Sequence, residues 1–238
     1  MSEVTYDEII YYPYTEPCKA LINQLLNGKY SLEETELLAS QINESYMNYL
    51  RKFNRNLGGK SNSRNGVGGT YDCIALCCVY ELCKDKVSLM DIEELEKKLF
   101  LTTFAKLRFV DLNNPILKRL YHFADSIAAK KGNKIDDYHM VVEPYDVKQP
   151  IRYHFTSCPV AEFAKQFGFD DALPYLCNAD FFGIELMHGK LIRKNTLGNG
   201  DVCDYAICGN KDPYVKEHEE YRDEVGYIRN TKRRSKQI

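Results

Sequence analysis

The stretch that decides the fold is Ile151-Arg152-Tyr153-His154-Phe155-Thr156, in which apolar and polar side chains alternate. Met140 and Val142 alternate in the same way upstream. A hydrophobic period of two is typical of half-buried β-strands, because successive side chains of a strand point to opposite faces. The sequence from Tyr138 onward therefore predicts a sheet.

Before that point the hydrophobic period is 3.6, which predicts helices. Ser31-Leu32-Glu33-Glu34 has the pattern of a capping box, in which Ser31 and Glu34 bond each other's backbone N–H groups. Apolar side chains then recur at steps of three and four, at Leu38, Ile42, Tyr46, Tyr49, Leu50 and Phe53. They predict one long amphipathic helix that ends at Gly58-Gly59, before a loop rich in Gly, Asn and Ser that runs to Gly69.

Three further helices are expected over 71–82, from Ser88 to Phe100 and after Pro115. The first is apolar on nearly all sides and should be buried. The apolar stripe of the second is Ile92, Leu95 and Leu99, and that of the third is Ile116, Leu120, Phe123 and Ile127. The first 130 or so residues therefore look like a helical layer or bundle.

Short elements are expected to follow the first strands. Pro159 marks the start of a short helix and Gly168 its end, and a second helix is expected around 174–182. The strands 191–196 and 202–208 are joined across Gly198-Asn199-Gly200, a strong hairpin signal. The predicted fold class is α+β, with a helical part over 1–135, an antiparallel sheet part over 136–210 and an extension over 211–238, all in one compact domain.

Composition excludes several classes of protein. The 238 residues contain 32 Lys and Arg against 34 Asp and Glu, a net charge of −2 that does not suit a nucleic-acid-binding protein. No window approaches the roughly 18 continuous apolar residues of a membrane span, so no membrane partner is expected. The acidic stretch 1–8 lacks the features of a secretory signal, which predicts a cytoplasmic protein.

Nine cysteines are a high and odd number for such a chain. In a reducing compartment they are thiols, metal ligands or nucleophiles rather than a disulfide framework. One cluster, Cys73, Cys77, Cys78 and Cys83, falls in the apolar helix, where buried Cys behaves as a small hydrophobic residue. No CxxC pair of the kind that wraps a metal ion occurs in the chain, and we therefore expect no metal and no cofactor.

Three other cysteines lie among polar and turn residues. Cys158 falls at a junction between a strand and a helix, where the helix N-terminus should lower the pKa of its thiol. Cys177 and Asp180 are three residues apart on an expected helix and should face the same side. Cys203 and Asp204 are adjacent on an expected strand and should face opposite sides. For each cysteine a structural role is the competing interpretation.

Arg193 lies on the strand before the Asn-Gly turn, and a tight hairpin would bring it near Tyr205. None of the five histidines forms a metal-binding or triad spacing. Only His154, on the strand that leads to Cys158, is a candidate proton carrier.

Several of these features occur together in the order of a known family. They are Cys158-Pro159, Cys177-Asn178-Ala179-Asp180, Arg193 with Thr196, Gly198-Asn199-Gly200, and Cys203-Asp204-Tyr205. This string resembles the C-terminal motifs of the L-2-amino-thiazoline-4-carboxylic acid hydrolase family, namely Cys-Pro, Cys-x-x-Asp, Arg-x-x-Thr, Gly and Cys-Asp-aromatic. Upstream, Gly58-Gly59-Lys60 with Asn62 resembles the family's N-terminal half. The chain has no Trp, and Tyr or Phe stand at aromatic positions of the family.

The resemblance implies a hydrolase that opens a small carboxylated thiazoline, a cyclic amidine, to an N-carbamoyl amino acid such as N-carbamoyl-L-cysteine. Such chemistry needs a carboxylate for the amidinium, a nucleophile or activated water for C2, and a cation for the substrate carboxylate. The catalytic candidates are Cys177, Asp180, Cys203 and Asp204. The substrate-binding candidates are Arg193, Thr196 and Cys158.

Two mechanisms remain open from the sequence: attack by a Cys177 thiolate, and attack by water assisted by an aspartate. The competing function is that of a noncatalytic protein that binds or senses a small molecule or cofactor. Fast thiol labelling of one of Cys158, Cys177 and Cys203 would favour the thiolate enzyme, and uniformly slow labelling would favour binding alone.

Overall fold

The computed structural model describes residues 4–6, 9–55, 57, 59, 69–133 and 139–233, with side chains described from Tyr12 onward. Several features discussed above lie outside these residues. They are most of the N-terminal stretch 1–8, Tyr138 at the change of period, and most of the loop from Gly58 to Gly69, including Lys60 and Asn62.

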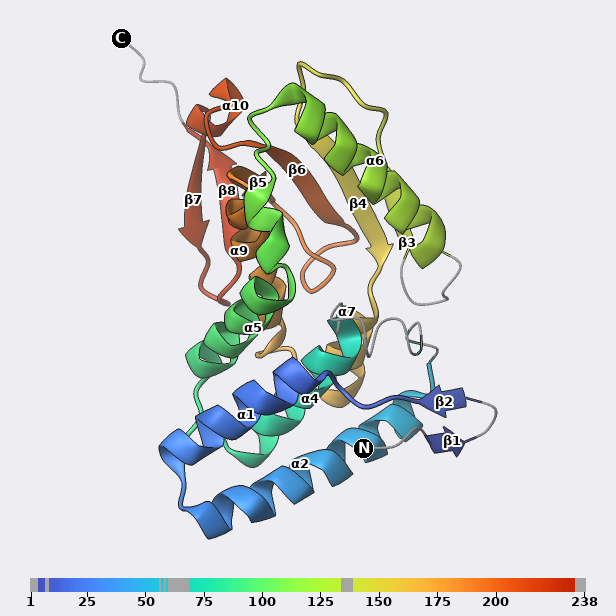
Figure 1. Cartoon of the computed structure of the whole chain (residues 1–238), viewed down its shortest axis with the longest axis vertical. Helices are drawn as coiled ribbons and strands as arrows, with labels where there is room; N and C mark the ends of the chain where they lie inside the picture. The colour runs from blue at the N-terminus through green and yellow to red at the C-terminus, as the bar shows by residue number, and fades with distance from the viewer. Residues whose placement is uncertain are drawn as a thin grey trace.

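The predicted α+β class is confirmed: helices come first, and an antiparallel sheet with short helices follows. Figure 1 shows the helical layer in the lower half of the molecule and the sheet in the upper half, with α5 rising between them. The helical layer consists of α1 (Glu16–Lys29), α2 (Leu32–Phe53), α4 (Gly69–Leu82) and α5 (Leu89–Thr103).

Capping side chains set the starts of these helices. Glu34 closes the predicted capping box with Ser31 at the start of α2, and Asp91 closes a second box with Ser88 at the start of α5. Helix α1 was not predicted from the sequence; its N-cap Thr15 accepts the Cys18 N–H at 3.3 Å. The α2 helix ends at Phe53, earlier than predicted, because Asn54 takes the left-handed conformation (φ 50°).

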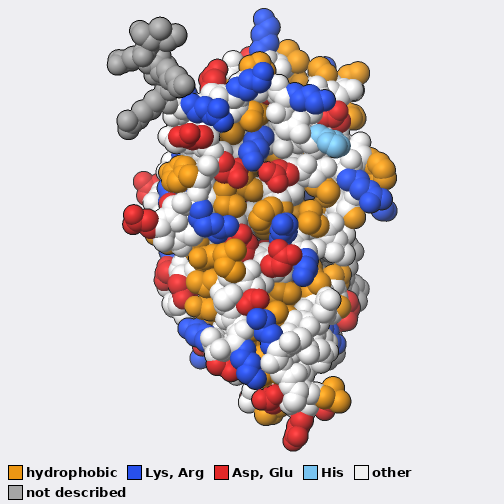
Figure 2. Space-filling model, turned by 90° about the vertical axis from the view of Figure 1, so that its left-hand side faces the viewer, with side chains coloured by type: hydrophobic (Ala, Val, Ile, Leu, Met, Phe, Trp, Pro, Cys, Tyr) orange, Lys and Arg blue, Asp and Glu red, His pale blue; other side chains and the backbone are white. Residues whose placement is uncertain are grey.

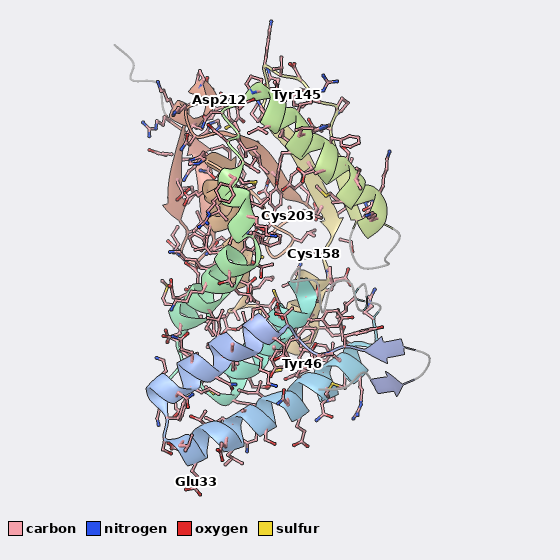
Figure 3. All side chains as sticks on the ribbon, viewed as in Figure 1. Glu33, Tyr46, Tyr145, Cys158, Cys203 and Asp212 are labelled. Atoms are coloured by element: carbon pink, nitrogen blue, oxygen red, sulfur yellow. The ribbon has the colours of Figure 1, made fainter. Side chains whose placement is uncertain are left out.

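Helix α4 is the centre of the helical layer, as its uniform hydrophobicity predicted. Every residue from Thr70 to Val79 is buried, and α1, α2, α5 and α7 (Pro159–Phe167) pack around it. The cysteines of this segment, Cys73, Cys77, Cys78 and Cys83, are all buried free thiols. Neighbouring core residues such as Tyr46, labelled in Figure 3, pack beneath them.

The main sheet has the strand order β3-β4-β6-β5 and is antiparallel throughout. Its strands are β3 (His139–Val142), β4 (Ile151–Ser157), β5 (Gly189–Ile192) and β6 (Cys203–Gly209). Two hairpins accompany it, β1 (Val4–Tyr6) with β2 (Ile9–Tyr11) and β7 (His218–Arg222) with β8 (Ile228–Lys232). The remaining short elements are η1 (Ala105–Phe109), α8 (Leu173–Cys177), α9 (Ala179–Leu186) and α10 (Pro213–Lys216).

The helix predicted around 174–182 is two helices, α8 and α9, which meet at Asn178. The Asn178 side chain is fully buried and donates to Glu93 Oε2 at 2.8 Å and to the Gly226 carbonyl at 3.0 Å. It also accepts the Ile228 N–H at 2.8 Å. Asn178 therefore ties the junction to α5 and to the C-terminal hairpin.

The predicted hairpin exists, but its first strand ends at Ile192 instead of residue 196, whereas β6 lies within one residue of its predicted bounds. Strand β5 stops at Ile192, because the backbone of Arg193 bonds Asn230 of β8 instead: its carbonyl accepts the Asn230 N–H at 2.8 Å, and its N–H donates to the side-chain Oδ1 of Asn230 at 3.0 Å. The predicted turn residue Asn199 closes the connection by accepting the Thr196 N–H at 3.1 Å. A Cβ at Gly198 would collide with the Tyr227 hydroxyl, so this glycine is required.

Helix α6 (Pro115–Gly132) departs most from the sequence prediction, because its apolar stripe faces solvent. The stripe residues Ile116, Leu120, Phe123 and Ile127 are 71%, 57%, 62% and 40% exposed. The opposite, more polar face covers β3 of the sheet: Lys118 Nζ donates to the Gln149 carbonyl at 2.7 Å, and His122 Nε2 lies 2.8 Å from the Glu143 carbonyl. Helix α6 therefore belongs to the sheet layer rather than to the helical layer (Figure 1).

Lys and Arg alternate with Asp and Glu over the face shown in Figure 2, in line with the near balance of the two charge types. In the part of the chain that the structure describes, no helix is both long and apolar enough to cross a membrane.

Candidate active site

A cavity of about 290 Å³ lies where the helical layer meets the sheet. Figure 3 shows Cys158 and Cys203 at this junction, between the lower helices and the upper strands. Its polar lining is Asp72, Cys73, Glu96, Thr103, Tyr153, Cys158, Cys177, Asp180, Thr196, Cys203 and Tyr205. A volume near the lower end of the range for ligand pockets suits a small molecule.

The register of the sheet decides which strand residues reach this cavity. Phe155 pairs with Cys203, and Tyr153 pairs with Tyr205, so all four lie on the cavity face. The residues between them, His154 and Asp204, pair with each other on the opposite face and contribute to a second hollow there.

Five of the seven residues singled out from the sequence line the cavity; they are Cys158, Cys177, Asp180, Thr196 and Cys203. Cys177 and Asp180 come from either side of the α8–α9 junction. Asn178 between them keeps a helical conformation (φ −71°, ψ −16°), so the two side chains still reach the same cavity.

Asp204 does not line the cavity. Its carboxylate accepts the Asn195 N–H at 2.5 Å and the Lys194 N–H at 3.2 Å, and so it holds the connection between β5 and β6. His154 likewise does not line the cavity.

Arg193 lies behind the cavity wall rather than in it. Its side chain is fully buried, with the guanidinium 4.9 Å from the centre of the Phe181 ring. Nη1 donates to Asp180 Oδ2 at 2.9 Å, and Nη2 donates to the Cys177 carbonyl at 3.0 Å. The predicted proximity to Tyr205 is confirmed, with Nη1 3.5 Å from the Tyr205 hydroxyl.

Asp180 combines a fixed position with access to the cavity. Its Oδ2 accepts from Arg193 and from the Tyr205 hydroxyl, the latter at 2.5 Å. Burial raises the pKa of Tyr205 well above its usual value, and the nearby Asp180 charge raises it further, so the phenol remains a donor. The Asp180 side chain is 34% exposed while that of its partner Arg193 is not exposed at all. The site therefore presents a carboxylate whose counterion is hidden from a ligand.

The thiols of the cavity are in their neutral form near pH 7. Burial raises the pKa of Cys158 to about 12 and that of Cys203 to about 11, and it raises the pKa of Cys177 well above the usual value even though Arg193 opposes the shift. The expected lowering at Cys158 was wrong in its net direction. The backbone N–H groups of Ala161 and Val160 do lower the pKa of this thiol, but burial outweighs them.

Two carboxyl groups of the cavity were missed in the sequence. Asp72 on α4 accepts the Thr15 N–H at 2.7 Å and the Thr15 hydroxyl at 2.8 Å, and burial raises its pKa to about 6. Burial raises the pKa of Glu96 on α5 to about 8. The available signal for Glu96 was its spacing, four residues after Ile92 and three before Leu99, within the buried stripe of the helix.

Among the described residues, no group of three or more His, Cys, Asp and Glu side chains could hold a metal ion. The described cavity lining also includes no Lys, Arg or His. Three carboxyl groups and four thiols make up most of its polar surface, and the partly exposed carboxylate of Asp180 can accept hydrogen bonds from the N–H groups of a ligand.

Residues 92–207 match the family described as L-2-amino-thiazoline-4-carboxylic acid hydrolase, which confirms over this segment the resemblance drawn from the motifs. The segment contains most of the polar cavity lining, from Glu96 to Tyr205, and excludes Asp72 and Cys73. The comparisons with curated proteins and with solved structures found no match.

Proposed function

With a segment of the L-2-amino-thiazoline-4-carboxylic acid hydrolase family in residues 92–207 as the premise, we propose that this chain opens a small carboxylated cyclic amidine in the cavity between helices and sheet. The substrate class is a 2-aminothiazoline carboxylate, and the product is an N-carbamoyl amino acid such as N-carbamoyl-L-cysteine. The observation that carries the proposal is Asp180, a carboxylate open to the cavity and held from behind by buried Arg193.

Asp180 suits both charge and proton demands of this reaction. The N–H groups of the ring amidinium can donate hydrogen bonds to the Asp180 carboxylate, and this pairing would place C2 beside Asp180. The same carboxylate can take a proton from the group that attacks C2. Because Arg193 and Tyr205 both bond Oδ2, the Oδ1 atom is the one we assign to the ligand.

Of the two attacking groups left open by the sequence, we favour water. The cavity thiols have raised pKa values and would not be thiolates near neutral pH. Water needs only a base beside it, which Asp180 provides. Cys158, Cys177 and Cys203 then act as neutral walls of the pocket.

Arg193 has a different role in this proposal from the one that the resemblance implied. It contacts Asp180 and the Cys177 carbonyl from behind the wall, so we assign it as a positioning residue for the carboxylate.

The test is incubation of the purified chain with L-2-amino-thiazoline-4-carboxylic acid, followed by thiol titration and mass detection of the N-carbamoyl product. A parallel reaction with 2-aminothiazoline, which lacks the carboxylate, measures how far this group is recognised. We expect turnover of the carboxylated ring and retention of activity in Cys177→Ser. Loss of turnover in a folded Cys177→Ser would favour the thiol route, and saturable binding without turnover would favour the noncatalytic alternative.

A further inference from the structure

Glu96 on α5 lines the cavity with one oxygen that lacks a protein partner. The Cys73 thiol lies 4.0 Å from Oε1, within hydrogen-bonding distance for sulfur. Oε2 is shielded from bulk solvent and has no hydrogen-bond partner among the described residues. A buried polar atom without a partner is costly, so a cavity-lining one is suited to bond a ligand.

Glu93, one turn earlier on the same helix, is a carboxylate whose two oxygens both have hydrogen-bond donors. Both of its oxygens receive the Arg222 guanidinium, at 2.7 and 2.8 Å, and Asn178 adds a bond at 2.8 Å. Glu96 has no such counterion among the described residues. Both residues are glutamates of α5, but an arginine side chain bonds the carboxylate of Glu93 and not that of Glu96.

The titratable groups around Glu96 are two carboxyl groups and three thiols. The carboxyl groups, Asp72 on α4 and Asp180 on α9, disfavour its charged form, and the thiols are those of Cys18 on α1 and of Cys73 and Cys77 on α4. Burial is the largest cause, and it raises the pKa of Glu96 to about 8, so the group carries a proton at neutral pH. Asp180, in contrast, is ion-paired with Arg193.

We propose that Glu96 is the acid that protonates the departing ring sulfur, an inference that rests on the proposed function. A protonated and an ionised carboxyl group in one pocket are the pair that acid–base hydrolysis requires. Glu96 and Asp180 are those two groups here, on α5 and α9, which pack against each other.

The proton and electron balance of the reaction is as follows. Water forms a bond to C2 of the amidinium, and Asp180 takes its proton, which leaves a neutral tetrahedral adduct. The C2–S bond then breaks with its electron pair on sulfur, and Glu96 gives its proton to that sulfur to form the thiol. The hydroxyl proton of the adduct passes to the Glu96 carboxylate as the carbonyl forms, and Asp180 releases the remaining proton to solvent.

The experiment compares Glu96→Gln with Glu94→Gln, a change at an exposed glutamate of the same helix that pairs with Lys97 and Lys98. We expect the rate of the wild type to fall above about pH 8, where Glu96 loses its proton. Glu96→Gln should lower kcat about 100-fold with little change in KM and should remove this fall. The control should keep both the rate and the pH profile of the wild type.

A leaving-group comparison separates proton donation from a structural effect. The oxazoline analogue of the substrate expels an alkoxide, which needs a proton more than a thiolate does, so Glu96→Gln should lose at least 10-fold more activity on the oxazoline than on the thiazoline. Equal losses on both rings, or an unchanged alkaline limb, would overturn the role of Glu96 while leaving the proposed function intact. An inactive wild type would instead overturn the proposed function, and this inference with it.

Discussion

At the scale of single residues, the site depends on how one charge is compensated. Arg193 is fully buried, and its guanidinium bonds Asp180 Oδ2 and the Cys177 carbonyl with different nitrogens. A planar fork can hold both acceptors at once, whereas a lysine ammonium cannot reproduce that geometry. Arg193 therefore fixes where Asp180 points.

This role predicts the effect of Arg193→Lys. We expect kcat to fall about 10-fold or more while KM changes little, because the variant keeps the charge but loosens the carboxylate. Steady-state kinetics on the thiazoline check this, with denaturant unfolding to establish that the variant is folded. A rise in KM at constant kcat would show instead that Arg193 holds the substrate carboxylate, as the family resemblance implied.

The sequence was informative about residues whose relation is local. Cys177 and Asp180 reach one cavity because residues three positions apart in helical backbone lie on the same side. Cys203 and Asp204 lie on opposite faces of the sheet because successive side chains of a strand alternate. Glu96 was not identified because the carboxyl groups that raise its pKa, those of Asp72 and Asp180, come from other segments of the chain. Its raised pKa arises from tertiary packing, which periodicity does not report.

At the scale of elements, α6 shows where hydrophobic periodicity misleads. A stripe at Ile116, Leu120, Phe123 and Ile127 is the usual mark of a core-facing surface, yet these side chains are exposed. On the inward face, the side chains of Lys118 and His122 form hydrogen bonds with backbone carbonyl groups. The hydrophobic pattern of the sequence does not predict such bonds. In contrast, α2 and α5 carry both a stripe and a capping box, and their predicted faces are buried.

The exposed stripe predicts an unusual tolerance to substitution. Phe123→Ser should change the free energy of unfolding by no more than about 0.5 kcal/mol, since surface positions rarely contribute more. Ile92→Ala on α5, at a fully buried position, should cost about 2 to 5 kcal/mol. Urea unfolding of both variants makes the comparison, and a similar cost for the two would contradict the orientation of α6.

At the scale of the whole molecule, buried carboxyl groups should make stability depend on pH. Burial is the main cause that raises the pKa of Asp72 to about 6, of Asp125 to about 7 and of Glu96 to about 8. An unfolded chain releases the same protons near pH 4. Between roughly pH 4 and 8 the folded chain therefore binds more protons than the unfolded one, and its stability must fall as the pH rises.

We expect the thermal midpoint to decrease from about pH 5 to pH 8.5, by about 2–4 °C for each kcal/mol lost. Asp125→Asn should flatten this dependence, because an amide cannot titrate, whereas the exposed Glu94→Gln should leave the slope as it is. Thermal unfolding followed by circular dichroism across this range gives the answer. A midpoint that rises over the same interval would mean that these groups are ionised in the folded chain.

We propose Asp180, inside the cavity, as the base that opens the ring, and not Asp204 on the other face of the sheet. The most direct test is the rate of N-carbamoyl-L-cysteine formation from L-2-amino-thiazoline-4-carboxylic acid by Asp180→Asn and Asp204→Asn, each checked for folding. We expect Asp180→Asn to lose at least 100-fold in kcat and Asp204→Asn to stay within a few-fold of the wild type. A folded Asp180→Asn with wild-type turnover, or loss confined to Asp204→Asn, would contradict this proposal.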